Sequence, residues 1–149
     1  LGALRLCANV PGQFAIEAAL TGIDTISALC APGGRLHEAR RAVVEACDAS
    51  PYLRLVAPAG ALYAFPGIAE EFSQGFDDHA FALELMEAEG VLVVPGNSFN
   101  VPYRNHFRVT LLPEPAQLRE VFSRIERVLD RQIIDARKVV PLVPRAVNG

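Results

Sequence analysis

The chain has 149 residues, of which 51% are hydrophobic and only 7% aromatic, and its formal net charge is -3. A chain of this length makes one domain, which buries roughly 70% of the surface that its unfolded form exposes. Because the charge is acidic and no basic run is longer than Arg40 and Arg41, direct binding of nucleic acid is not expected.

Membrane and metal binding are not indicated either. No apolar run approaches the roughly 20 residues of a membrane-spanning helix, so no membrane association is expected. The histidines are scattered and have no spacing typical of metal ligands, so no metal site is expected. The cysteines lie on apolar helical patterns without a CxxC spacing, and we expect reduced thiols packed as small hydrophobes in an intracellular protein. They are Cys7, Cys30 and Cys47.

The first part of the chain predicts two helices. Residues 11–20 open with a proline suited to a first helical turn and continue in good helix formers. Residues 35–47, RLHEARRAVVEAC, are amphipathic, and Arg41 and Glu45 are spaced for an i,i+4 ion pair. The apolar stripe of this second helix consists of Leu36, Ala39, Val43 and Cys47. We expect the helix to end before Pro51.

Two short strands are predicted next, at 53–58 and 61–65. The turn residues around which they lie are Pro58, Ala59 and Gly60. On local grounds such a turn is typical of a hairpin connection. We expect Tyr63 and Phe65 to be core aromatics.

A loop and a helix complete the middle of the chain. Residues 65–76 are predicted to be a loop. Asp77 and Asp78 supply an N-terminal cap and acid in the first turn of a helix that continues over 79–89. Gly90 is expected to end it.

The last part predicts two strands and a long helix. Residues 91–94, VLVV, form a short apolar strand, and in 106–112 the side chains alternate between two faces. After two prolines, apolar residues recur at helical spacing. They are Leu118, Val121, Phe122, Ile125, Val128, Leu129 and Ile133. The prediction is an α+β domain with a small mixed or antiparallel sheet flanked by helices, and with residues 137–149 as a tail that leaves the core.

Arg108 places a positive charge in the middle of the strand predicted over 106–112. An ion taken out of water without a partner is costly, so this side chain is either solvated or ion-paired, or it binds an anion. A guanidinium offers two parallel N–H donors that match the two oxygens of a carboxylate. The preceding loop, 96–100, starts with a glycine, which lets the backbone approach a small ligand closely. For the nearby Arg104, a surface charge is favoured over a role in binding a distal carboxylate.

Four motifs occur in order along the chain, and together they resemble a known family. They are RLCANVPGQ at 5–13, PAGALYAFP at 58–66, GVLVVPGNSFN at 90–100 and HFRVTLLP at 106–113. This series is similar to the C-terminal part, including the small domain, of the fold-type-I pyridoxal-phosphate-dependent aminotransferases, over residues 1–132. RLC with VPGQ, and HFR followed by T and LP, resemble the alanine aminotransferase branch.

The resemblance implies roles for individual residues. The arginine that matches Arg108 grips the α-carboxylate of the amino-acid substrate, while Gly60, Phe99 and Asn100 line the domain cleft. Asn100 stands where many aminotransferases have a glycine, a change that is tolerable because asparagine visits left-handed conformations. The implied reaction passes an amino group from alanine to pyridoxal 5'-phosphate and then to 2-oxoglutarate, in a cytoplasmic homodimer whose substrates are amino acids and 2-oxo acids.

The resemblance also implies a division of the chain and a missing part. Residues 1–30 match the end of the large domain and a crossover helix, 31–136 the small domain, and 137–149 a tail. The cofactor needs a lysine for its Schiff base, and the only lysine is Lys138, in the tail. Because the chain starts at Leu1 rather than at methionine, we expect a fragment whose catalytic and cofactor-binding residues lie upstream. Such a fragment is expected to be inactive alone and to self-associate.

Other functions stay open at this point. An aminotransferase of different amino-acid specificity carries the same motifs. An aminotransferase-like domain also serves as the ligand sensor of transcription regulators fused to a DNA-binding module. A third possibility is a domain that acts only as a scaffold.

Overall fold

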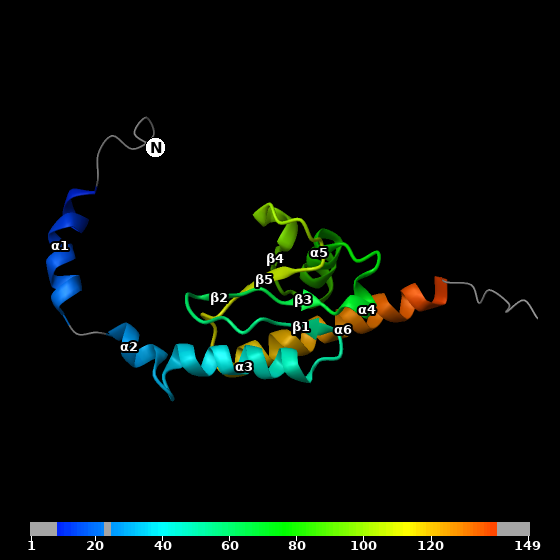
Figure 1. Ribbon diagram of the computed structural model, residues 1–149, viewed down its shortest axis with the longest axis horizontal. Helices are drawn as coiled ribbons and strands as arrows, with labels where there is room; N and C mark the ends of the chain where they lie inside the picture. Colours follow the sequence, from blue (N-terminus) through cyan, green and yellow to red (C-terminus); the bar gives the residue numbers. More distant parts are fainter. Residues whose placement is uncertain (1–8, 23–24, 140–149) are drawn as a thin grey trace, which may run out of the picture.

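The computed structural model describes residues 9–22 and 25–139 of the chain. Two long helices, α3 (Arg35–Ala49) and α6 (Pro115–Val139), pack side by side beneath short strands, and α5 (Asp78–Glu89) packs against α6 and the strand β4 (Figure 1). The remaining helical elements are α1 (Val10–Thr21), α2 (Thr25–Cys30), α4 (Glu70–Ser73) and the 3₁₀ turn η1 (Gly96–Phe99). The strands are β1 (Leu53–Arg54), β2 (Tyr63–Ala64), β3 (Gly67–Ile68), β4 (Val94–Pro95) and β5 (Phe107–Thr110). This arrangement confirms the α+β prediction.

The strands form two small antiparallel sheets. β5 is the central strand of one, with β2 on one side and β4 on the other, and β1 pairs with β3 in the second. An antiparallel bridge between Gly67 and His106 joins the two sheets. Strand β5 thus has β2 and β4 as neighbours, and the residue before it contacts β3.

The predicted hairpin between residues 53–58 and 61–65 is wrong. In the structure β1 pairs with β3, which places buried Leu53 opposite buried Ile68, while β2 pairs with β5. The prediction of a loop over 65–76 is also wrong, because these residues contain β3 and α4. The turn between β1 and β2 therefore carries the chain from one sheet to the other.

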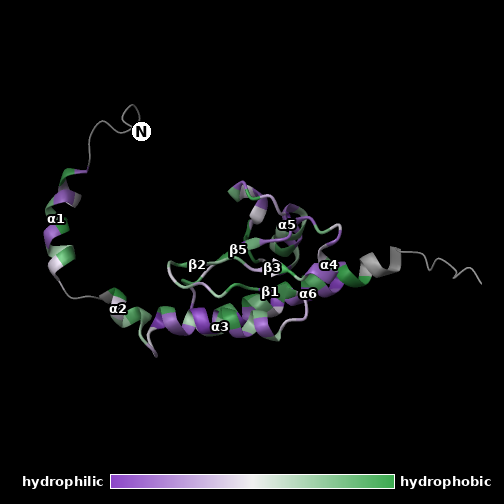
Figure 2. Cartoon of the chain, viewed as in Figure 1, coloured by the Kyte–Doolittle hydropathy of each residue, from purple (hydrophilic) through white to green (hydrophobic). Residues whose placement is uncertain are grey.

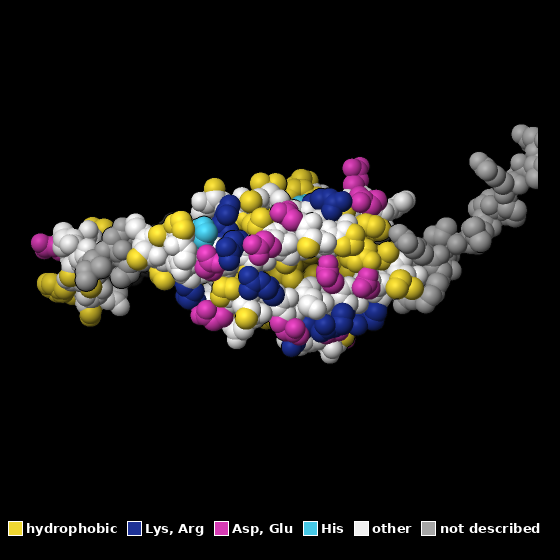
Figure 3. Space-filling view, turned by 90° about the horizontal axis from the view of Figure 1, so that it is seen from below, with side chains coloured by type: hydrophobic (Ala, Val, Ile, Leu, Met, Phe, Trp, Pro, Cys, Tyr) yellow, Lys and Arg dark blue, Asp and Glu magenta, His cyan; other side chains and the backbone are white. Residues whose placement is uncertain are grey.

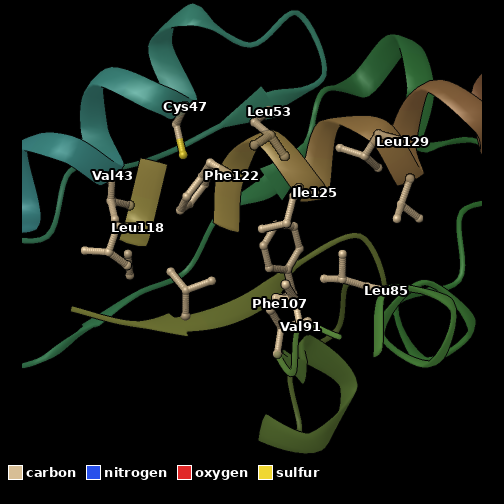
Figure 4. Packing of buried hydrophobic residues seen from close by; sticks show 14 of the residues in the cluster. Val43, Cys47, Leu53, Leu85, Val91, Phe107, Leu118, Phe122, Ile125 and Leu129 are labelled. Carbon is tan, nitrogen blue, oxygen red and sulfur yellow. The ribbon is translucent and has the colours of Figure 1, made fainter. Parts of the chain in front are cut away.

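The core lies between the helices and the strands. Figure 4 shows side chains of α3 and α6 meeting those of β1, β5 and α5, with Phe122 and Ile125 of α6 at the centre. The helical period predicted for α6 is confirmed, because five of its seven apolar positions are buried and Val121 and Ile133 are partly buried. Figure 2 shows hydrophilic and hydrophobic residues alternating along α3, as an amphipathic helix requires.

The ends of α5 follow the predicted capping. The Asp77 side chain accepts hydrogen bonds from the amides of His79 at 2.9 Å and Ala80 at 3.1 Å. These backbone donors hold the pKa of Asp77 below its ordinary value. At the other end, Gly90 has φ 64° and ψ 27°, the left-handed conformation typical of a helix C-terminus.

The α1 helix, predicted over 11–20, is confirmed at Val10–Thr21, but it buries none of its residues. Phe14 is 83% exposed and Leu20 is 81% exposed. The helix lies apart from the sheets in Figure 1. Apolar surface of this kind is typical of a segment that another part of a protein covers.

The cysteines differ from one another. Cys47 is buried in the core, as predicted, but Cys30 is exposed, so the prediction of a packed thiol is wrong there. Cys30 is the last residue of α2, and that short helix buries little. Cys7 lies outside the described residues, as do residues 140–149 of the predicted tail, whereas 137–139 continue α6.

None of the described helices alone combines the length and the apolar composition of a membrane span; α1 and Ile26–Ala49 reach both only together, and the chain bends by 63° between them. No group of three or more described His, Cys, Asp or Glu side chains is arranged to hold a metal ion.

Figure 3 shows the face formed by α3 and α6, where arginine and acidic side chains are intermingled and no block of one sign gathers.

Candidate functional site

Arg108 lies in the middle of β5 and points away from the core. The predicted alternation is confirmed, since Phe107 and Val109 are buried while Arg108 and Thr110 are half-buried on the other face. Val94 of β4 lies opposite Arg108, and Tyr63 of β2 lies opposite Thr110. The two neighbouring strands therefore deliver side chains to both sides of the arginine.

Two aromatic rings hold the guanidinium of Arg108. Its central carbon lies 4.4 Å from the centroid of the Tyr63 ring and 4.9 Å from that of the Phe99 ring. A cation over an aromatic face gains about 0.5–1 kcal/mol at exposed sites. Contact with two rings leaves the planar guanidinium few positions, so its N–H donors are restricted in direction.

No described residue offers Arg108 a counter-ion. The hydrogen bonds and ion pairs among the described side chains include none to this guanidinium. A guanidinium has five N–H donors and accepts no hydrogen bond, so these donors are left for solvent or for an anionic ligand. The sequence left open whether Arg108 is solvated or ion-paired, or binds an anion. An ion pair with another described residue is not observed.

A hollow of about 420 Å³ lies beside this guanidinium, and we call it the Arg108 pocket. It is lined by Val56, Pro58, Tyr63, Ala64, Phe65, Phe99, Val101, Tyr103 and Arg108. One cation on an otherwise apolar and aromatic wall fits a small organic anion. The described lining contains no lysine and no acidic side chain, so the Arg108 pocket does not fit pyridoxal phosphate, which needs an amine for its aldehyde.

The four residues that the sequence analysis singled out do not all meet. Arg108 and Phe99 line the same pocket, but Gly60 and Asn100 are not among its described lining residues. Gly60 lines a neighbouring hollow of about 270 Å³ with Arg40 and Leu111. Arg104 is an exposed loop residue whose charge acts on Asp77, which agrees with the surface charge favoured above.

Gly96, at the start of the loop 96–100, is required for a different reason from the predicted one. A Cβ at Gly96 would lie 2.7 Å from the carbonyl oxygen of His106, so this glycine permits close packing on β5 rather than close approach of a ligand. The loop ends at Asn100, which has φ 55° and ψ 37°. The prediction that asparagine takes a left-handed conformation here is confirmed.

The aromatic residues of the site were only partly anticipated. The core placement predicted for Tyr63 is wrong, because its side chain is 48% exposed and lies over Arg108 on the outer face of the sheet. Phe65 is half-buried and contacts the rings of Phe99 at 5.7 Å, Tyr103 at 6.2 Å and His106 at 5.2 Å between centroids. The edge-to-face contact with Phe65 supports the ring of Phe99.

His106 was not recognised as a part of the site. Its ring stacks on Phe65 with an interplanar angle of 27°, and its Nδ1 lies 2.8 Å from Oδ1 of Asn105. Burial lowers the pKa of His106, and the nearby acid Asp78 opposes this shift. The sequence could have indicated His106 only by its position two residues before Arg108, because residues two apart in an extended segment lie on the same face.

The family whose sequence model matches this chain is described as aminotransferase class I and II, and the match covers residues 3–125. The glutamate-pyruvate aminotransferase AlaA of Escherichia coli (strain K12) is 41% identical over 129 residues, which cover 87% of this chain and 32% of that protein. An alanine aminotransferase of Mycobacterium tuberculosis (strain ATCC 25618 / H37Rv) is 40% identical over 129 residues, 87% of this chain and 30% of that protein. The chain spans about a third of the length of these curated relatives.

Solved structures give the same result at the level of the fold. An aminotransferase from Escherichia coli superposes with a TM-score of 0.79 at 41% identity, over 86% of this chain and 32% of the other. The resemblance drawn from the four sequence motifs is therefore confirmed.

Proposed function

Since this chain belongs to the class I and II aminotransferases, we propose that it supplies the carboxylate-binding half of an amino-acid transamination site. The observation that carries the proposal is the guanidinium of Arg108, held between Tyr63 and Phe99 at the edge of an apolar pocket with no acidic partner among the described residues. Every 2-amino acid and 2-oxo acid has a carboxylate next to the reacting carbon. A forked donor fixed in direction can therefore orient either substrate.

The described residues perform binding and orientation. Two parallel N–H donors of Arg108 would hold both carboxylate oxygens, which fixes the rotation of the substrate about its Cα–carboxylate bond. Apolar and aromatic side chains flank this ion pair in the Arg108 pocket, and the large domain proposed below would cover the pocket, exclude water and strengthen the pair. Pyridoxal phosphate, when bound in the complete protein, supplies the electron sink for the amino-group transfer.

Alanine and glutamate are the proposed amino donors, with pyruvate and 2-oxoglutarate as the corresponding 2-oxo acids. The names of the two relatives, at 40–41% identity, support this assignment. The described pocket does not itself choose among amino acids, because Arg108 contacts the group that all of them share. A different amino-acid specificity is thus an alternative outcome of the substrate test below.

We further propose that the active species is a homodimer of a longer chain, with residues 1–30 belonging to a large domain. The exposed apolar residues of α1, such as Phe14 and Leu20, support this division, because the core described above begins only at Ala39. Phe99 and Tyr103 are also 39% and 41% exposed beside the Arg108 pocket, where a large domain would cover them. A cytoplasmic location rests on the resemblance alone.

The test uses the complete protein loaded with cofactor. Arg108→Ala is expected to raise the KM for L-alanine and for glutamate by about 100-fold, because truncating one partner of a hydrogen-bonded charge pair that the complete protein would cover costs about 2–5 kcal/mol. Arg108→Lys is expected to raise the same KM values by about tenfold, since lysine keeps the charge but not the planar fork. The absorbance of bound cofactor should not change in either variant.

Arg104→Ala is the matched control, because it removes an exposed arginine four residues away and should change KM by less than about twofold. Equal KM values for the unsubstituted protein and Arg108→Ala would refute the proposed role of Arg108. If the protein turned over another amino acid in preference to alanine and glutamate, the role of Arg108 would stand and the proposed substrates would be wrong.

A further inference from the structure

Asp78 is a buried acid outside the Arg108 pocket. It is the first residue of α5, and it is only 1% exposed. Its Oδ2 accepts a 2.7 Å hydrogen bond from the backbone amide of Asn97, and its buried Oδ1 has no hydrogen-bond partner among the described residues. Burying an acid with so few partners is costly, so its retention calls for a reason.

Helix capping does not supply that reason. The neighbouring Asp77 already caps α5, through its hydrogen bonds to the amides of His79 and Ala80. Asp78 instead reaches across to η1, the turn that carries Phe99. Two adjacent acids therefore have separate tasks: Asp77 stabilises its own helix, and Asp78 joins that helix to the turn.

The backbone of η1 is fixed at two successive amides. The amide of Gly96 donates to the carbonyl oxygen of His106 at 2.8 Å, and the next amide, of Asn97, donates to Asp78. Two residues further along, the ring of Phe99 lies 4.9 Å from the guanidinium carbon of Arg108. The turn is thus fastened to the residue before β5 on one side and to α5 on the other, which restricts the positions that this ring can take.

We propose that Asp78 is a positioning residue of the carboxylate site, which acts through the Asn97 amide to hold Phe99 over Arg108. The inference rests on the proposed function of Arg108 and extends it to a residue that touches neither substrate nor arginine. Without the Asp78 acceptor, the partly buried Asn97 amide loses its partner, and η1 leaves the position in which Phe99 restricts the guanidinium.

The experiment compares three single variants in the complete, cofactor-loaded protein, with propionate as a competitive monocarboxylate probe. Asp78→Ala is expected to weaken propionate binding and raise the KM for L-alanine about tenfold, the effect of losing one partly buried hydrogen bond to a charged group. The kcat at saturating alanine should stay within about twofold, since bound substrate still meets the same reacting groups. Asp78→Asn keeps an acceptor oxygen at the same place and is expected to restore propionate binding to within about threefold.

Asp77→Ala is the matched control. It removes the adjacent acid and destabilises α5 through the lost cap, so the melting temperature should fall while propionate binding changes by less than about twofold. A second readout is hydrogen exchange of residues 94–101, which should accelerate in Asp78→Ala and not in Asp77→Ala. Should Asp78→Ala not fold, Asp78→Glu, which displaces the carboxylate by one methylene, is expected to show the same weakened binding and faster exchange.

The outcomes separate this inference from the proposed function. Unchanged propionate binding in Asp78→Ala, or equal weakening in Asp78→Ala and Asp77→Ala, would overturn the positioning role alone. Equal weakening in Asp78→Ala and Asp78→Asn would also overturn it, because the acceptor would then not be what matters. Failure of the unsubstituted protein to bind propionate, or of Arg108→Ala to weaken that binding, would overturn the proposed function, and this inference with it.

Discussion

The amide of Gly96 donates a 2.8 Å hydrogen bond to the carbonyl oxygen of His106, and a Cβ at residue 96 would lie 2.7 Å from that oxygen. The start of η1 is thus in direct backbone contact with the strand that carries Arg108. Gly96→Ala is expected to push the two segments apart and to lower the free energy of unfolding by about 1–3 kcal/mol, the usual cost of overpacking.

Gly60→Ala is the control for that change. A Cβ at Gly60 would meet nothing within 4 Å, and its φ is not positive. Its free energy of unfolding in urea should therefore stay within about 0.5 kcal/mol of the unsubstituted value, as for most surface changes. Equal effects of the two glycine substitutions would show that contact with His106 does not determine the requirement for glycine.

Tyr63→Leu tests the ring over the guanidinium of Arg108. Loss of the aromatic face removes a contact worth about 0.5–1 kcal/mol, so propionate binding to the complete protein should weaken about two- to fivefold. Tyr63→Phe keeps the ring and is expected to bind as tightly as the unsubstituted protein. Weaker binding in Tyr63→Phe would instead assign the effect to the hydroxyl group.

Ile125→Ala tests the core beneath the site. Ile125 of α6 is 0% exposed and lies at the centre of the packing in Figure 4. Its truncation is expected to lower the free energy of unfolding by about 2–5 kcal/mol, through lost burial and the cavity left behind. Ile134→Ala, on the same helix but 51% exposed, should cost less than about 1 kcal/mol. Urea denaturation followed by circular dichroism measures both.

The two described cysteines should differ in reactivity. Burial is the main cause that raises the pKa of Cys47 to about 12, with a smaller contribution from Asp48, whereas Cys30 is exposed. The thiolate is the reactive form, and its fraction at pH 8 falls about tenfold for each unit of pKa. Iodoacetamide at pH 8 should therefore modify Cys30 rapidly and Cys47 only after denaturation, as peptide mass spectrometry would show. Rapid modification of Cys47 in the folded protein would mean that α3 opens readily.

The sequence was most informative where structure is local. Helical periodicity and caps depend on residues a few positions apart, which is why α3, α5 and α6 were predicted with nearly correct ends. The partner of a strand depends on residues far away in the chain, so the pairing of β1 with β3 could not be read from the turn between β1 and β2.

The same distinction applies to the site. Arg108 was singled out because a charge inside an apolar strand is unusual, and the resemblance to aminotransferases supplied the carboxylate as its expected ligand. Tyr63, His106 and Asp78 were not assigned to the site, because their roles arise only when β2, β5 and α5 are brought together. Buried acids and half-exposed aromatics look ordinary in a sequence, and packing alone distinguishes them.

His106 makes the stability of the domain depend on pH. Burial lowers the pKa of His106 in the folded state, while its pKa in the unfolded chain stays near the ordinary 6.5. Between these two values the unfolded state binds more protons, so the stability contributed by neutral His106 is present above about pH 6.5 and is lost as the pH falls towards the folded pKa. The groups that face the ring are Phe65, Tyr103, Asn105 and the acid Asp78, which opposes the shift.

His106→Gln should therefore flatten the decline in melting temperature between about pH 7 and pH 5, whereas His79→Gln, at an exposed position on α5, should leave it unchanged. An equal decline in all three proteins would show that other groups cause it.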